Sequence, residues 1–216
     1  MTQLYVHHRI TTEPRQFQTV ANACRQSGAT SIAEAGGLLY GIWRSQIGRP
    51  RDELTVMTVW PDDEVTTTAS EAFLTTIPSI RHNQSERMTP TLRPKKTDPP
   101  RRQGLYAFRW FETPADHWPE FLDLCTEAWQ VFEAAYDSQV IGLWRSLEVE
   151  DHLRRSLLLT RRPNLAMWER SKIPGTEAEA EMRRKLSRRY DLCDWTWVYT
   201  TTLLTAEDQD DLVRWT

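Results

Sequence analysis

The sequence predicts an α+β protein made of two tandem β-α-β-β-α-β units, whose antiparallel sheets pack together into a single-chain α/β barrel. The chain matches itself at an offset of 101 residues, and each copy places strand-like and helix-like segments in the same order. Each predicted sheet also has apolar residues on both faces. Helices can cover one face, and the other copy can cover the second.

The internal repeat has nine identities over residues 4–45 without a gap. Its densest block is Gly41-Ile42-Trp43-Arg44-Ser45, which aligns with Gly142-Leu143-Trp144-Arg145-Ser146. The repeat divides the chain into a first unit at residues 1–92 and a second at 105–216. Residues 93–104 between them are rich in proline and arginine, which predicts an exposed linker.

Each copy can be followed element by element. A first strand (4–10 or 105–111) is followed by a proline that opens a helix. In the second copy, apolar residues recur at intervals of three and four from Trp118 to Phe132, as on one helix face. Cys24 and Cys125 lie within these stripes, so we interpret them as core residues.

A predicted hairpin comes next, at 38–47 with 54–60 and at 140–147 with 153–161. A second helix follows and is clearest at 177–190, and the last strands are expected at 87–92 and 195–205. This order is the ferredoxin-like plan. The second helix has acidic residues early and basic residues late, so we interpret the run from Arg183 to Arg189 as a solvated helix end.

Composition excludes several classes of protein. The chain is 39% apolar and 26% charged, which is typical of a globular protein, and its net charge of −3 favours neither nucleic acid nor anionic lipid as a partner. No apolar run approaches a membrane span, and the first ten residues do not resemble a signal peptide. With three scattered cysteines, these features predict a cytoplasmic protein.

The strand with Gly-x-Trp-Arg-Ser-x-Ile-Gly (41–48), its hairpin and the strand ending in Val59-Trp60 resemble the NIPSNAP family of the dimeric α/β-barrel superfamily. The join from Thr91-Leu92-Arg93-Pro94 to Gly104-Leu105-Tyr106 is also similar to that family. The second copy departs from the pattern at Glu148-Val149 and at Arg161-Arg162. The resemblance implies an eight-stranded barrel with a cavity between two sheets. Its superfamily includes cofactor-free oxygenases, isomerases, haem enzymes and proteins without known activity, and it transfers no catalytic residue.

The adjacent His7 and His8 must point to opposite faces of the first strand, so they cannot chelate one metal. We expect His7 to line the cavity, because Leu4 and Val6 on the other face suit helix packing. The expected cavity face comprises Tyr5, His7, Arg9, Tyr106, Phe108 and Trp110. His7 is a candidate general base, and a hydrogen-bonded structural histidine is the alternative.

In the pairs Trp43-Arg44 and Trp144-Arg145, only one member of each pair can line the cavity. Lining arginines would clamp an anion, whereas lining tryptophans would favour a flat apolar ligand. A third interpretation places the tryptophans in the core and the arginines at the surface.

No HExxH, P-loop, GxGxxG, GxSxG or CxxC motif is present, so we expect neither a metal site nor a cofactor. Asp62-Asp63-Glu64 is expected to cap a helix. Two functions fit these observations. One is a cofactor-free oxygenase or an isomerase/cyclase that acts on a small aromatic or apolar molecule, with His7 as base. The other is a non-catalytic barrel that binds a ligand or a partner protein, as a monomer or homodimer.

Overall fold

The computed structural model describes residues 3–61, 65–148 and 152–208. Followed through their hydrogen-bonded neighbours, eight strands form a closed barrel in the order β1-β3-β2-β8-β5-β7-β6-β4. The first four are β1 (Leu4–Thr12), β2 (Leu38–Ile47), β3 (Glu53–Trp60) and β4 (Ile80–Pro90). The other four are β5 (Leu105–Pro114), β6 (Gln139–Ser146), β7 (Leu153–Arg162) and β8 (Trp195–Leu203). The predicted fold class is confirmed.

The chain divides into two compact units, each made of segments that are separate in the sequence. The first contains Met1–Pro90, Lys96–Gln103 and Tyr199–Thr216, and the second contains Thr91–Lys95 and Gly104–Val198. The last part of β8 therefore belongs to the first unit, where it pairs with β2.

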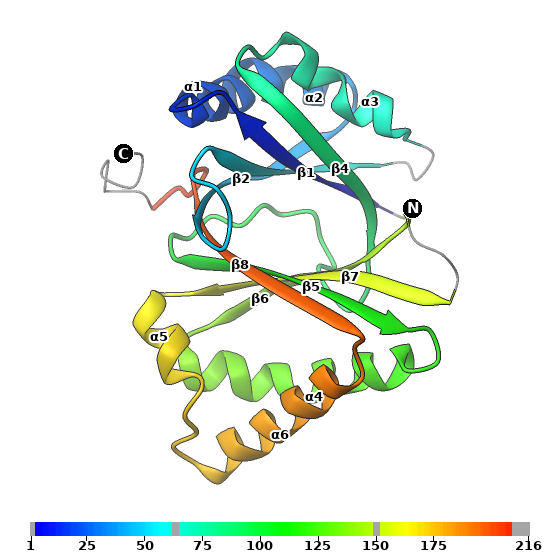
Figure 1. Ribbon diagram of the computed structural model, residues 1–216, viewed down its shortest axis with the longest axis vertical. Helices are drawn as coiled ribbons and strands as arrows, with labels where there is room; N and C mark the ends of the chain where they lie inside the picture. The colour runs from blue at the N-terminus through cyan, green and yellow to red at the C-terminus, as the bar shows by residue number, and fades with distance from the viewer. Residues whose placement is uncertain (1–2, 62–64, 149–151, 209–216) are drawn as a thin grey trace. The chain divides into compact units, whose positions relative to one another are not determined.

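In the first unit, short helices cover one face of the sheet (Figure 1). They are α1 (Phe17–Ala23), α2 (Ala29–Glu34) and α3 (Thr67–Glu71), with a π-helical turn at Cys24–Gly28 and a 3-10 turn at Ala72–Thr76. Leu4, Val6 and Ile10 of β1 pack in the helix-side core together with Cys24, as predicted. The expected capping cluster at residues 62–64 lies outside the described residues, and Thr66 caps α3.

The prediction of a last strand beginning at residue 87 in the first copy was wrong. β4 begins at Ile80 and pairs with β1 along its length, from Thr12↔Ile80 to Tyr5↔Met88. The segment from Arg81 to Glu86 is polar and exposed or half-exposed throughout, so its side chains do not show the apolar alternation that indicates a strand. Backbone pairing with β1 determines its conformation.

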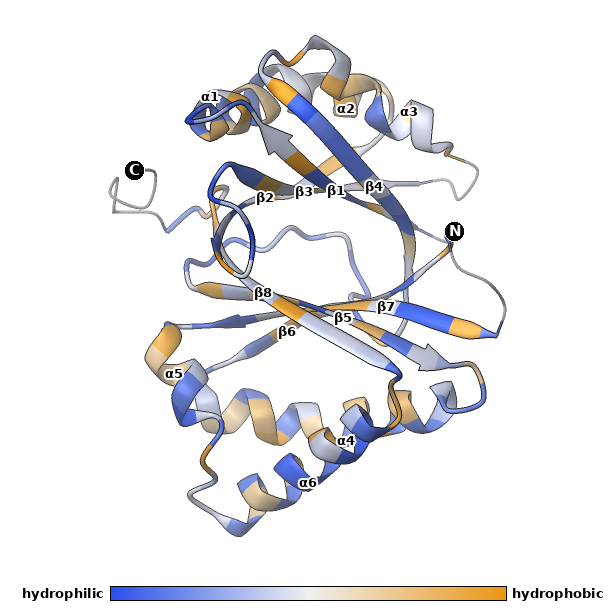
Figure 2. Ribbon diagram, in the orientation of Figure 1, coloured by the Kyte–Doolittle hydropathy of each residue, from blue (hydrophilic) through white to orange (hydrophobic). Residues whose placement is uncertain are grey.

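In the second unit, α4 (Trp118–Tyr136) packs against α6 (Glu177–Asp191) over one face of the sheet (Figure 1). The predicted stripe of α4 is buried and includes Phe121, Cys125, Trp129 and Phe132. α6 is mostly hydrophilic (Figure 2), apart from buried Met182 and a few other positions. The short helix α5 (Leu165–Arg170) precedes it.

The repeated Gly-x-Trp motif has the same structural basis in both copies. A Cβ atom at Gly41 would lie 2.5 Å from the ring of Trp43, and one at Gly142 would lie 2.4 Å from the ring of Trp144. The strand register shifts at the equivalent place in each hairpin, between Leu39 and Gly41 and between Val140 and Gly142. The glycines provide the space in which the fully buried tryptophan rings lie.

We expect Gly142→Ala to lower the free energy of unfolding by about 1–3 kcal/mol, because the added methyl group overlaps a ring that cannot move within the core. Urea denaturation monitored by circular dichroism would measure this change. Gly175→Ala is the control, since its Cβ atom would meet no aromatic ring: its nearest neighbours would be the end of the Arg170 side chain and, at 3.7 Å, Glu179 Oε2. Equal effects of the two substitutions would contradict this explanation of the motif.

Candidate ligand-binding site

The two histidines of β1 face opposite sides of the sheet, as predicted. The ring of His8 packs edge-on against Phe73 on the helix side, and its Nε2 lies 3.4 Å from Thr58 Oγ1. On the other side, His7 Nε2 lies 3.1 Å from the Tyr199 hydroxyl, which also lies 3.1 Å from Thr55 Oγ1. Both histidines are buried, and each has a hydroxyl partner.

Burial lowers the pKa of both histidines to about 3. The charges of His8, Arg49 and Arg9 add to this effect at His7. The two arginines lie 3.3 and 3.6 Å from the buried carboxylate of Glu53. At neutral pH both imidazoles are therefore neutral, and His7 is a weak base.

In both Trp-Arg pairs, the tryptophan side chain lies on the sheet face away from the helices. Trp43 and Trp144 are fully buried there, whereas the Arg44 guanidinium lies over the ring of Phe17 in α1, with 4.3 Å between its central carbon and the ring centre. Arg145 is half-buried and lies on the face of β6 opposite Trp144. Arg44 also lines a shallow surface hollow together with Arg49 and Arg51.

The other residues that we expected to line a cavity lie, like the two tryptophans, on the sheet face away from the helices. Tyr5 is buried with its ring edge-on to Tyr40, and Arg9 pairs with Glu53. In the second copy, the buried Tyr106, Phe108 and Trp110 alternate along β5 with the residues that face the helices.

A cavity of about 270 Å³ lies on the helix side of the sheet in the second unit. None of the site residues expected from the sequence lines it. Strands β5, β6 and β7 form its floor, and α4, α5 and α6 form its walls. Its lining comprises Ala107, Arg109, Phe111, Val140, Leu158, Thr160 and Arg162 from the strands and Trp129, Phe132, Trp168, Arg183, Leu186, Ser187, Arg189 and Tyr190 from the helices.

Two of the lining arginines stack on aromatic rings. The Arg162 guanidinium carbon lies 4.8 Å from the ring centre of Phe132 and 4.4 Å from that of Trp168. That of Arg189 lies 5.0 Å from the ring centre of Phe111, and its Nη1 donates to Cys125 Sγ at 3.4 Å. Such cation–π contacts stabilise a guanidinium from its faces and leave the N–H groups at its edge available.

The pocket is strongly positive. Burial and the charge of Arg189 lower the pKa of Arg109 to about 10, while burial and the charge of Arg109 lower that of Arg162 to about 10. Arg109 and Arg162 therefore remain cationic at neutral pH. The Nε atoms of Arg162 and Arg189 are buried without a hydrogen-bond partner among the described residues, and the lining contains no aspartate or glutamate.

Arg189 corrects the expectation that the basic run of α6 is solvated throughout, because its exposed fraction is only 7%. Two sequence signals could have revealed this pocket. At the 101-residue offset, Leu105 and Ala107 correspond to Leu4 and Val6, which are expected on the helix side, so strand alternation also places Arg109 there. On α6, Arg189 follows Met182 by seven residues, on the same helix face.

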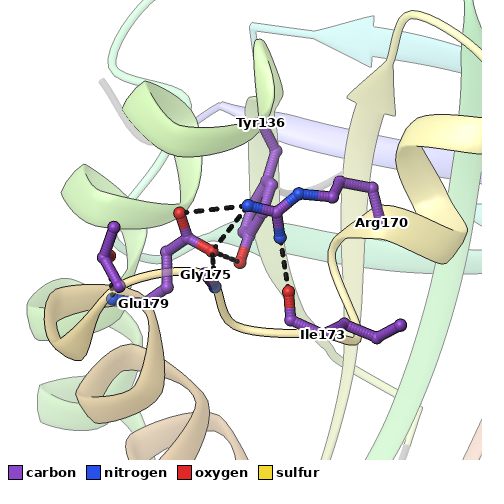
Figure 3. A network of polar contacts seen from close by, with 6 residues as sticks. Tyr136, Arg170, Ile173, Gly175 and Glu179 are labelled. Atoms are coloured by element: carbon purple, nitrogen blue, oxygen red, sulfur yellow. Dashed lines mark hydrogen bonds and ion pairs between the residues drawn. The ribbon is translucent and has the colours of Figure 1, made fainter.

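A polar network fixes the helices around the cavity (Figure 3). The carboxylate of Glu179 in α6 accepts hydrogen bonds from the Tyr136 hydroxyl of α4 at 3.1 Å, the Gly175 N–H at 2.8 Å and Arg170 of α5 at 3.1 Å. The bond from Gly175, followed by those from Tyr136 and Arg170, lowers the pKa of Glu179. The network holds α5, and with it Trp168, against the other two helices.

The buried histidines predict acid sensitivity. A folded-state pKa of about 3, against about 6.5 in the unfolded chain, means that the unfolded state binds more protons between these values, so stability falls as the pH falls. Replacing His8 by glutamine should reduce the slope of unfolding free energy against pH by about 1.4 kcal/mol per pH unit between about pH 6 and 4. Urea denaturation of both proteins across this range measures the difference, and parallel curves would contradict it.

Two further features concern metals and membranes. Among the described residues, no three histidine, cysteine, aspartate or glutamate side chains are grouped so that they could hold a metal ion. No helix in the described part of the chain has both the length and the apolar character that crossing a bilayer requires.

No protein-family model matches the sequence, and no curated protein is significantly similar to it. Solved structures share its fold. A protein of Fusobacterium nucleatum described as a "putative monooxygenase" superposes with a TM-score of 0.63 at 9% identity, covering 94% of this chain and 93% of that one. A haem-binding protein of Thermus thermophilus gives a TM-score of 0.54 at 11% identity, covering 94% of this chain and 91% of that one.

A third similar structure is a ferredoxin-fold protein of Listeria monocytogenes related to antibiotic biosynthesis monooxygenases. It gives a TM-score of 0.50 at 9% identity, covering 94% of this chain and 95% of that one. At these identities the similarity establishes the fold alone. The chain has the fold of the dimeric α/β-barrel, ferredoxin-like proteins.

Proposed function

We propose that this protein binds a small molecule with a flat, apolar body in the helix-side cavity of its second unit. The observation that carries the proposal is an approximately 270 Å³ cavity walled by Trp129, Phe132 and Trp168 and closed below by the sheet. An engineered apolar cavity of about 150 Å³ is known to take up benzene, so this one has room for one or two fused rings. Aromatic walls with a few polar groups are typical of ligand pockets.

This proposal keeps the ligand class expected from the sequence and moves its site. Apart from the half-buried Arg9, the expected residues on the other sheet face are bulky and buried, and some already contact other buried rings, as Tyr5 contacts Tyr40 and His7 contacts Tyr199. Membership of the NIPSNAP family and a cytoplasmic location are further proposals. The first is supported by the Gly-x-Trp-Arg-Ser motif that occurs in both copies.

A cofactor-free oxygenase or isomerase with His7 as base is the enzymatic alternative. The description of the F. nucleatum neighbour as a monooxygenase favours it. However, the His7 pKa of about 3 makes its imidazole a poor proton acceptor at neutral pH, and its Nε2 is already in contact with Tyr199. The geometry supports ligand binding better than catalysis by His7.

The haem-binding neighbour raises the question of whether the cavity suits haem. Proteins hold haem iron with histidine, cysteine, methionine or tyrosine. The cavity lining contains no histidine, cysteine or methionine, and its one tyrosine, Tyr190, is 56% exposed. The residues present do not fit a haem ligated inside this cavity.

Filling the cavity tests the proposal. Ala107→Leu adds a branched side chain at the cavity floor, so binding of the two-ring probe 2-naphthoate should weaken at least 10-fold, while the melting temperature stays equal or rises. Isothermal titration calorimetry measures the binding. Ala178→Leu, the same change at an exposed position of α6, is the control and should leave binding unchanged. If the natural protein does not bind 2-naphthoate, or if Ala107→Leu binds it as well as the natural protein does, the proposed site is wrong.

A further inference from the structure

We propose that the ligand of this pocket is an organic anion, whose oxyanion group is held by Arg109, Arg162 and Arg189 while its apolar body lies on the aromatic walls. This inference rests on the proposed function, since it names the class of molecule that the same cavity would bind. It is carried by the charges of the cavity and by the way in which its arginines are held.

Three of the pocket arginines differ from arginines elsewhere in the second unit that form ion pairs. The half-buried Arg155 pairs with Glu112 at 2.9 Å, and on the surface Arg188 pairs with Glu120 at 2.7 Å and Arg184 with Glu177 at 2.7 Å. Among the described residues, Arg109, Arg162 and Arg189 form no such pair, and aromatic rings support two of them instead. Buried charges are normally paired, because removing an ion from water without a partner is costly.

The three cations also repel one another. The charge of Arg189 contributes to the lowered pKa of Arg109, and that of Arg109 contributes to the lowered pKa of Arg162. An anion placed among them would relieve this repulsion and provide the missing counter-charge. In the free protein this repulsion is an unfavourable contribution to the free energy, and a negatively charged ligand would remove it.

The available donors suit an oxyanion. Arg162 Nη1 is occupied by Thr160 Oγ1 at 3.2 Å and Arg189 Nη1 by Cys125, but the Nε atoms of both are unpartnered among the described residues. The Nη2 groups of Arg162 and Arg189 form no hydrogen bond among the described residues, so their N–H groups are left for a ligand. Carboxylates and related groups accept such hydrogen bonds in pairs, with shorter and stronger contacts than neutral acceptors.

The first copy provides an internal comparison. At the 101-residue offset, Arg109 corresponds to His8, which lies on the helix side of its own sheet. There the side chain is neutral and has its partner in Thr58, and the ring of Phe73 packs against it. The positive charge at this position belongs to the second copy alone, where the cavity lies.

The test compares two probes of the same shape that differ in charge, 2-naphthoate and neutral 2-naphthamide, by isothermal titration calorimetry at low ionic strength. We expect the natural protein to bind the carboxylate at least 10-fold more tightly. Arg109→Gln and Arg189→Gln should each lose most of that preference, because the amide cannot replace the charge. Arg188→Gln, on the exposed side of the same helix, is the matched control and should retain it.

If the natural protein binds the two probes with equal affinity and Ala107→Leu binds neither, the anion inference is wrong and the proposed binding site stands. If Ala107→Leu still binds both probes, the proposed site itself is wrong. A preference for the carboxylate that survives both Arg109→Gln and Arg189→Gln would also overturn the inference.

A second measurement does not depend on the choice of organic probe. At matched ionic strength, sulfate should raise the melting temperature of the natural protein and of Arg188→Gln more than chloride does. The increment caused by sulfate should be smaller in Arg109→Gln than in these two proteins. Without sulfate, Arg109→Gln should melt at the same or a higher temperature, because it removes a half-buried charge that has no carboxylate partner among the described residues. Equal sulfate increments in the three proteins, or a lower melting temperature of Arg109→Gln without sulfate, would count against the inference.

Discussion

Side chains alternate between the two faces of a β-strand, and in this protein that alternation decides the environment of every residue considered for function. Side chains at neighbouring positions lie in different environments because one faces the helices and the other does not. His8 lies against Phe73 while His7 contacts Tyr199, and Arg44 lies over Phe17 while Trp43 is buried on the other face. The same rule places Phe108 away from the helices and Arg109 beneath them.

The two copies use this common frame differently. Both retain the Gly-x-Trp packing and the register shift beside it. This packing requires a particular backbone conformation, and the side chains at the glycine and tryptophan positions can vary little in volume. Their helix layers have diverged. The first copy is covered by short helical segments over a mostly aliphatic core, whereas the second has the continuous helices α4 and α6. The cavity and its arginines lie between those longer helices and their sheet.

Stability and binding place different demands on the second unit. The Glu179 network joins three helices with a carboxylate whose hydrogen bonds are well satisfied, and it holds Trp168 at the cavity wall. At the same cavity, three arginines lie without a carboxylate partner among the described residues, and aromatic rings contact two of them, Arg162 and Arg189. Local departures from the usual rules of burial are expected at functional sites, and here the departure occurs in a rigidly supported cavity.

The sequence by itself determined the repeat, the order of elements, the barrel and the opposite orientations of His7 and His8, because these depend on local periodicity and on the 101-residue offset. It did not determine the start of β4, where polar side chains conceal a strand that pairing with β1 creates. Nor did it locate the cavity. Whether space remains beneath a helix layer depends on how α4, α5 and α6 pack, and only the tertiary structure shows that Arg109, Arg162 and Arg189 meet there without an acidic partner among the described residues.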